Sequence, residues 1–184
     1  MGRVAIFVDV QNIYYTVKQN YNCHFNYDAF WANVTSNREV IKAIAYAIDK
    51  GDKNQIQFQQ ILKRIGFEVK LKPFIQRSDG SSKGDWDIGI TLDMLDYAKD
   101  VDVVVLASGD GDFALVIDKI RNEYNVSVEV YGVQNLTAPA LIGSADEIEE
   151  DKIEASYKHG VLKVILPKTA KAREARKKIK VNVQ

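Results

Sequence analysis

Apolar runs and amphipathic segments alternate along this chain. Residues 4–8 and 101–107 are almost wholly apolar, which is typical of parallel strands buried on both faces of a sheet. Residues 54–65 place apolar side chains mostly at helical spacing and end at Gly66, a residue type that commonly closes helices. Residues 85–99 show the same helical period. The apolar face expected for this second helix contains Ile88, Leu92, Met94 and Leu95.

The other segments continue the alternation. Residues 12–19 predict the start of a helix, and residues 20–37 predict a loop with a short helix that packs on the core. Residues 39–48 predict a strand, although their alanines also permit a helix. Two more strands and a helix are predicted at residues 67–74, 127–132 and 113–124. The pattern therefore predicts an α/β fold in which helices cover both faces of a parallel sheet.

Length and composition indicate an ordinary globular protein. The 184 residues, 46% hydrophobic and 27% charged, suffice for one domain and a short appendage. No apolar run approaches the roughly 20 residues that span a bilayer, and the first residues lack the regions of a signal peptide. We therefore expect a cytoplasmic protein that binds no membrane. A single cysteine excludes an internal disulfide, and two histidines give no cluster with the spacing of a zinc site.

The formal net charge of zero conceals an uneven distribution. Residues 1–157 hold 16 Lys and Arg against 24 Asp and Glu, whereas residues 158–184 hold 9 against 1. The body of the chain is thus acidic and its tail basic. If the protein acts on nucleic acid, bound cations or the basic tail must offset the repulsion between the body and the phosphates.

Aspartates follow two of the predicted strands. Asp9 ends the first apolar run, and Asp110 follows the second after a tight turn. Ligands of open α/β sheets bind beyond the carboxyl ends of the strands, so the two carboxylates would converge if these strands are neighbours. Asp112 lies at the start of the next predicted helix, and Asp87 lies in the first turn of the preceding one. Four carboxylates are therefore expected to meet in one cleft.

Such a cluster has a chemical and a structural interpretation. Four carboxylates repel one another unless cations lie between them, and hard oxygen ligands select Mg²⁺ or Mn²⁺. One or two such ions can orient and deprotonate a water and stabilise the charge that develops on a scissile phosphate. Taken singly, an aspartate at a helix start is usually a cap, and one after a strand is usually a turn residue. The joint placement favours the metal site.

Polar neighbours of the aspartates are candidates for substrate binding. Asn12 is expected to contact a metal-bound water or a phosphate oxygen, with helix capping as the alternative. Ser108 is expected to hold the loop that carries Asp110 or to contact phosphate. Lys83 is expected to neutralise a phosphate from the edge of a loop, unless it is simply solvated.

Further acidic and aromatic residues lie nearby in the sequence. Asp85 is expected to cap the helix that follows it, Asp93 to support the ligands from behind, and Asp96 to lie on a solvated face. Exposed aromatic side chains beside such a site can stack bases, although packing in the core is the commoner role of any one of them. The candidates are Tyr14, Tyr15 and Trp86.

Three ordered blocks resemble the NYN domain, the LabA-like branch of the PIN-like nuclease superfamily. They are FVDVQNIYY, KGDWDIGITLDML and VVVLASGDGDFALVIDKI, and the resemblance covers roughly residues 3–148. It implies a three-layer α/β/α, PIN-like and Rossmann-like fold with a central parallel sheet and a ribonuclease site dependent on Mg²⁺ or Mn²⁺. The positions that match the family's acidic cluster and its polar companions are Asp9, Asp87, Asp110, Asp112, Asn12 and Ser108.

The middle block departs from the family pattern. Many members place one residue between Gly and Asp, whereas here Gly84 is followed by Asp85, Trp86 and Asp87. Either aspartate can therefore match the ligand position. The six-residue step from Asp87 to Asp93 favours Asp87.

The end of the chain resembles another family. From residue 153 onward, including GVLKVILPK and the Ile179-Lys180-Val181 segment, it is similar to the last strands and C-terminal extension of a small heat-shock protein's α-crystallin domain. The short match does not imply chaperone activity. We expect an NYN-like domain at residues 1–150 and a strand pair with a basic tail at residues 151–184. This appendage is expected to form a homodimer by strand addition or to contact RNA, with a solvated tail as the alternative.

These observations predict a metal-dependent endoribonuclease that cuts single-stranded RNA. Asp9, Asp87 and Asp110 would be metal ligands, and Asp112 would complete the catalytic cluster. Another phosphoryl-handling enzyme, such as a phosphatase or a flap-type DNA nuclease, would use the same acids. A catalytically weak regulatory module that binds RNA or protein through the same fold is the alternative from a different class, and the acidic body of the chain favours it.

Overall fold

The computed structural model describes residues 1–49, 51–73, 75–76, 82–83, 85–133, 135–144, 154–158 and 161–165. The strands of its main sheet are β1 (Gly2–Asp9), β2 (Arg38–Asp49), β3 (Glu68–Pro73), β6 (Val103–Ala107) and β7 (Ser127–Tyr131). The helices are α1 (Val10–Tyr21), α2 (Tyr27–Thr35), α3 (Lys53–Ile65), α4 (Asp87–Ala98), η1 (Gly111–Phe113), α5 (Ala114–Tyr124) and α6 (Pro139–Ser144). Two antiparallel pairs complete the description: β4 (Ile75–Gln76) with β5 (Ser82–Lys83), and β8 (Glu154–Lys158) with β9 (Val161–Ile165).

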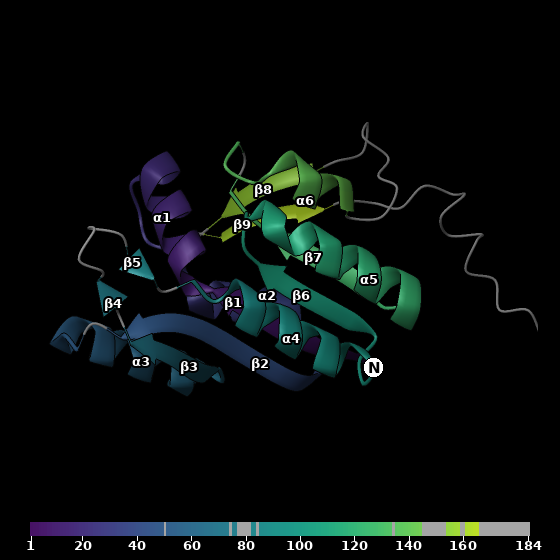
Figure 1. Ribbon diagram of the computed structural model, residues 1–184, viewed down its shortest axis with the longest axis horizontal. Coiled ribbons are helices and arrows are strands. Elements are labelled where there is room, and N and C mark those ends of the chain that lie inside the picture. The colour runs from purple at the N-terminus through teal and green to yellow at the C-terminus, as the bar shows by residue number, and fades with distance from the viewer. Residues whose placement is uncertain are drawn as a thin grey trace, which may run out of the picture.

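The five main strands are all parallel and follow the order β3-β2-β1-β6-β7 (Figure 1). Helices α1, α2 and α3 pack on one face of the sheet, and α4, α5 and α6 pack on the other. The predicted three-layer α/β/α fold is therefore confirmed. Because β1 is central and the chain moves outward from it in both directions, β1 and β6 form the topological switch point, where open α/β sheets bind their ligands.

The strands form where the apolar pattern predicts them. Residues 4–8 of β1 are fully buried, since alternate side chains enter the two apolar layers. The strand interpretation of residues 39–48 is confirmed by β2, whose alanines lie under the helices of the first layer. Helix α3 ends at Gly66, where φ of 131° is a backbone conformation that favours glycine.

The apolar face expected for α4 is wrong in part. Ile88 and Leu92 are 74% and 58% exposed, and the helix instead buries Ile90, Met94 and Ala98. These three follow one another at four-residue steps and so form a stripe of their own. The segment carries apolar residues on both sides, and only docking on the sheet determines which side is buried.

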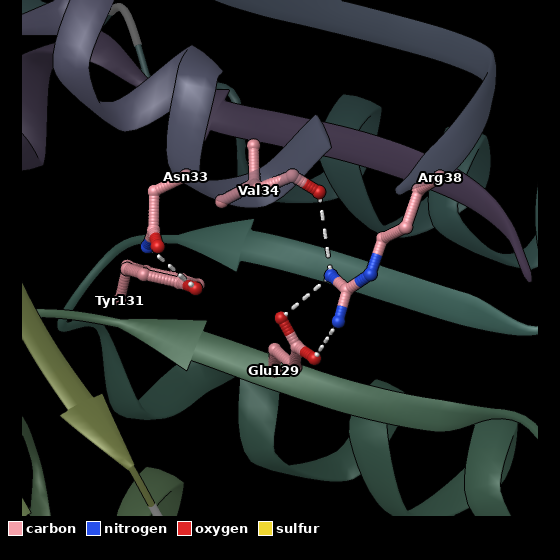
Figure 2. A network of polar contacts seen from close by, with 5 residues as sticks. All are labelled: Asn33, Val34, Arg38, Glu129 and Tyr131. Atoms are coloured by element: carbon pink, nitrogen blue, oxygen red, sulfur yellow. Dashed lines mark hydrogen bonds and ion pairs between the residues drawn. The ribbon is translucent and has the colours of Figure 1, made fainter. Parts of the chain in front are cut away.

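A polar bridge joins the start of β2 to the edge strand β7 beneath α2 (Figure 2). The Arg38 guanidinium donates two hydrogen bonds to the Glu129 carboxylate, at 2.6 and 3.0 Å, and a third to the carbonyl of Val34 at 3.3 Å. This pairing raises the pKa of Arg38. Beside it, the Asn33 amide donates to the Tyr131 hydroxyl at 3.4 Å. The bidentate geometry fixes α2 against a strand that is distant in the sequence.

The second antiparallel pair lies against the domain. Strand β9 contacts β7 and α2, on the outer side of the edge strand (Figure 1). A strand pair is thus present where the C-terminal resemblance predicts one, while residues 166–184 lie outside the described part of the chain. Within the described segments, every helix is too short or too polar to cross a membrane.

Candidate active site

Two strand ends bring the first acids together. Asp9 is the last residue of β1, and Val8 beside it pairs with Ala107, the last residue of β6. The loop after β6 carries Asp110 three residues further on. The neighbouring strands that the sequence analysis required are therefore present, and Asp9 and Asp110 both lie at the carboxyl edge of the switch point.

Side-chain hydrogen bonds cross-link the two loops. The Ser108 hydroxyl lies 3.4 Å from Oδ2 of Asp9 and accepts from the Asp110 amide at 3.2 Å. The Asn12 side chain accepts from the Gly109 amide at 2.9 Å, while the Asn12 amide donates to Oδ1 of Asp9 at 3.1 Å. Asp9 thereby caps α1 and also faces the loop after β6. The first turn of α1 and this loop form one rigid unit.

These contacts refine the roles expected for Asn12 and Ser108. Ser108 holds the loop of Asp110, one of its two predicted roles, and it is fully buried. The Asn12 side chain holds Gly109 instead of capping the helix. Contact of either residue with a substrate stays a prediction. The side chain of Lys83 lies outside the described residues.

A second loop supports the segment that carries Asp110 and Asp112. The Ala138 amide donates to the Gly109 carbonyl at 2.9 Å, and the Asp112 amide donates to Oδ1 of Asp110 at 3.0 Å. A Cβ on Gly109 would lie 2.8 Å from the carbonyl oxygen of Leu136. The sequence analysis did not predict this contact between the two loops. The one feature that could have indicated it is Gly109, because so close an approach of two backbones requires a glycine.

Contacts of the Trp86 side chain set the start of α4 and hence the position of Asp87. The Trp86 indole donates to the Ala47 carbonyl at the end of β2 at 2.9 Å. The Lys72 ammonium lies 4.8 Å from the centre of the Trp86 ring and donates to the Asp85 carbonyl at 2.6 Å. Trp86, and not Asp85, precedes the helix, and no side chain caps it. The expectation that Asp85 is the cap is therefore wrong, because contacts with β2 and β3 determine where the helix begins.

Electrostatics link all four predicted aspartates. Burial raises the pKa of Asp87 to about 6, and the charges of Asp110, Asp85, Asp9 and Asp112 contribute to this rise. Burial also raises the pKa of Asp9, helped by the charge of Asp110 and opposed by hydrogen bonds from Asn12 and Ser108. Carboxylates resist ionisation in this way when they share a desolvated site. We call Asp9, Asp87, Asp110 and Asp112 the aspartate cluster.

The donor chemistry of the cluster fits a hard divalent cation. Carboxylate oxygens are the ligands of Mg²⁺ and Mn²⁺, and a cation would relieve the repulsion that raises the pKa of Asp87. In residues 1–49, 51–73, 85–133 and 135–144, no three His, Cys, Asp or Glu side chains lie close enough to enclose an ion as direct ligands. Mg²⁺ commonly keeps several waters and takes only one or two carboxylates from a protein, so this spacing suits a hydrated ion.

The remaining acids of α4 lie apart from the cluster. Asp93 accepts from the Lys70 ammonium at 2.7 Å and from the Tyr46 hydroxyl at 2.6 Å, which makes it a structural ion pair between α4, β2 and β3. Asp96 is exposed, as expected. Asp85 is exposed as well, whereas Asp87 interacts with the three other members of the cluster. Burial and electrostatics thus place Asp87 in the aspartate cluster, and the choice of Asp87 over Asp85 as a metal ligand stays a prediction.

The aromatic candidates divide into two kinds. Trp86 is held by its hydrogen bond to the Ala47 carbonyl and by the Tyr46 ring, whose centre lies 5.3 Å from its own, so its role is packing. Tyr14 and Tyr15 are 49% and 54% exposed, so core packing is excluded for both. Tyr27, on the short helix expected to pack on the core, is 8% exposed, and its pKa is raised by burial and by the charge of Asp9.

Fold and site together describe an α/β protein with an acidic cluster at the switch point of a parallel sheet. The chain belongs to the NYN domain family, which matches residues 3–152 and is a PIN-like, nuclease-type family. It is 31% identical over 154 residues to the low amplitude and bright protein LabA of Synechococcus elongatus, and the match covers 79% of this chain and 81% of LabA.

One solved structure and one further family complete the comparison. The chain is 54% identical to a protein of unknown function from Vibrio parahaemolyticus, with a TM-score of 0.75 over 79% of this chain and 90% of that one. Residues 143–184 match the Hsp20/alpha crystallin family, in agreement with the C-terminal resemblance. This second match covers too little of the chain to assign the protein to that family.

Proposed function

We propose that this protein is a metal-dependent endoribonuclease that hydrolyses phosphodiester bonds of RNA at the aspartate cluster. The observation that carries the proposal is the meeting of Asp9 and Asp110 at the carboxyl edge of β1 and β6, where Ser108 and Asn12 hydrogen-bond both loops. Burial raises the pKa of Asp87, and the charges of the other acids add to this rise. Capping accounts for Asp9 and for Asp110 singly, but it does not account for the convergence of four acids that repel one another at a ligand-binding edge. A phosphate-handling site with bound cations does account for it.

Each residue has a defined task in this proposal. Asp9, Asp87 and Asp110 would hold a hydrated Mg²⁺ or Mn²⁺, partly through its bound waters, and Asp112 would complete the acidic shell. When bound, the metal supplies a polarised water and neutralises charge on the phosphate. Asn12 and Ser108 hold Asp9 and Asp110 in fixed relative positions, because each hydrogen-bonds both Asp9 and the loop after β6.

The preferred substrate is single-stranded RNA. The body of the chain is acidic, so its surface offers little attraction to the paired phosphates of a duplex. Lys83 is proposed to contact a phosphate of the strand. The relatives leave the substrate open, because the name of LabA mentions no nucleic acid and the Vibrio protein is of unknown function.

A catalytically weak regulatory module is the second candidate. Two observations favour it: the acidity of the body, and the absence of three converging metal ligands in the part of the chain that the structure describes. Such a module would bind RNA or a protein partner through the same fold. It differs from the enzyme in one measurable respect, since its RNA would remain intact after prolonged incubation with metal.

Cleavage of labelled RNA separates the two candidates. Purified protein would be incubated with single-stranded and structured RNAs in Mn²⁺, in Mg²⁺ and in EDTA, beside the variant Asp110→Asn. The matched control is Asp96→Asn, an exposed carboxylate on α4 outside the cluster. Cleavage that requires metal, disappears in Asp110→Asn and persists in Asp96→Asn would establish the enzyme. Intact RNA with well-folded protein would favour the module, and equal activity of Asp110→Asn would exclude this site as the catalytic one.

A further inference from the structure

Helix α1 is the least acidic of the helices α1, α4 and α5 that flank the site. Its twelve residues, VQNIYYTVKQNY, include one charged side chain, Lys18. Helix α4 carries three aspartates, and α5 carries two acids and two bases. A polyanion that reaches the aspartate cluster is therefore repelled least along α1.

Two tyrosines occupy the outer surface of this helix. Tyr14 and Tyr15 are 49% and 54% exposed, while Val10, Ile13 and Val17 form the buried side. The two rings meet edge to face, with centroids 5.3 Å apart and planes at 76°. This mutual contact restrains both side chains and leaves large aromatic surfaces in solvent, although neither ring belongs to an apolar core cluster.

The position of α1 relative to the cluster is fixed. Asp9 caps its first turn, and Asn12 holds the Gly109 amide at 2.9 Å. Tyr15 lies three residues after Asn12, so the two are neighbours on the helix surface. It is also six residues after Asp9, about 9 Å further along the helix axis. Tyr15 is thus presented next to the turn that holds Asp9 and Asn12, and the Tyr14 ring lies against it, on a helix that is hydrogen-bonded to the Asp110 loop.

We propose that Tyr14 and Tyr15 form a stacking site for unpaired bases of a single RNA strand whose phosphate lies at the aspartate cluster. The assignment to RNA rests on the proposed function. Stacking uses no charge, so it supplies affinity where the acidic body cannot attract phosphates. It also selects single strands, because the faces of bases are covered in a duplex. Tyr pairs are well suited to this role, since they offer a large surface with only two side-chain torsions to restrain.

The test measures binding separately from cleavage. The full chain in EDTA is titrated into a fluorescein-labelled oligouridylate and a mixed-sequence single strand, with a duplex of the same sequence as the comparison, and anisotropy is recorded. The variants are Tyr14→Ala, Tyr15→Ala and Tyr15→Trp. The matched control is Tyr124→Ala, which removes a 37% exposed tyrosine from the last turn of α5.

Stacking of a base is worth about 1–3 kcal/mol, so each alanine variant should weaken single-strand binding by roughly 5- to 150-fold. Tyr15→Trp should bind at least as tightly as the original chain, and duplex binding and the Tyr124→Ala variant should be unchanged. Wild-type affinity in both alanine variants, an equal loss for single strand and duplex, or no single-strand binding by the original chain would each overturn the proposal. Stacking without metal-dependent cleavage would refute the enzyme and leave this site in place.

Discussion

Replacing Asp87 with asparagine should stabilise the protein at neutral pH. Asp87 has a pKa of about 6 in the folded protein, against an ordinary value of 3.8. The folded state therefore binds the proton more tightly than the unfolded state does, and stability falls as pH rises from about 4 to about 6. Above that window the penalty is constant. For a fully buried carboxyl, a pKa shift of this size would lower the free energy of unfolding by about 3 kcal/mol.

The net gain should be smaller than this limit. Asp87 is only partly buried, so solvent screens part of the repulsion. Its negative charge in the first turn of α4 also interacts favourably with the helix dipole, by about 0.3–1 kcal/mol. We therefore expect Asp87→Asn to raise the free energy of unfolding by about 1–2 kcal/mol at pH 7.5. For a chain of this length, that is a rise of roughly 2–8 °C in Tm.

Urea unfolding at pH 7.5 and at pH 4, in EDTA, measures the effect. At pH 4 the Asp87 carboxyl is largely protonated in the folded state, so the stabilisation should shrink or vanish. The matched control Asp96→Asn, an exposed residue of the same helix, should change stability little at either pH. A stabilisation that is equal at both pH values, or a destabilisation at pH 7.5, would refute the electrostatic account of the cluster.

Three further sets of substitutions test contacts around the site. Gly89→Ala places a Cβ 2.7 Å from the Trp86 ring, so it should lower the free energy of unfolding by about 1–3 kcal/mol and change the tryptophan fluorescence. The control Gly143→Ala meets nothing within 4 Å and should leave stability unchanged. Equal stability of the two variants would show that the packing of Trp86 at the start of α4 is unimportant. Tyr46→Phe removes a 2.6 Å hydrogen bond to Asp93 and should cost about 1–3 kcal/mol in urea unfolding. Tyr27→Phe removes a buried hydroxyl with no hydrogen-bond partner in the part of the chain that the structure describes, and should cost nothing. A larger loss in Tyr27→Phe than in Tyr46→Phe would contradict this assignment. Arg38→Met leaves Glu129 unpaired beneath α2 and should lower the free energy of unfolding by about 1–3 kcal/mol. Adding Glu129→Leu should restore most of this loss. If the losses of the two single variants simply add in the double variant, the two side chains are not coupled.

The sequence predicted the parts of the fold that depend on local pattern. The apolar runs around Val4 and Val104 became neighbouring parallel strands, and Asp9 and Asp110 followed their ends as expected. These features need only strand periodicity and the rule that parallel strands share a carboxyl edge. Helix boundaries were close for the same reason, since α3 and α5 begin and end near their predicted residues.

Long-range contacts account for what the sequence left open. The start of α4, and with it the choice between Asp85 and Asp87, depends on an indole that reaches the carbonyl of Ala47, 39 residues away. The partner of Asp93 is Lys70 on another strand. No periodicity encodes such pairings, because each depends on how α4 docks on the finished sheet.

The central position of β1 also has a consequence for synthesis. As the chain leaves the ribosome, β1 can pair at once with β2, but its other edge stays open until β6 has been made, about a hundred residues later. Asp9 lies near the start of the chain, whereas Asp87, Asp110 and Asp112 come much later. A nascent chain that ends before Asp110 therefore carries no complete acidic cluster, and the chemistry proposed for this protein becomes available only after β6 has docked beside β1.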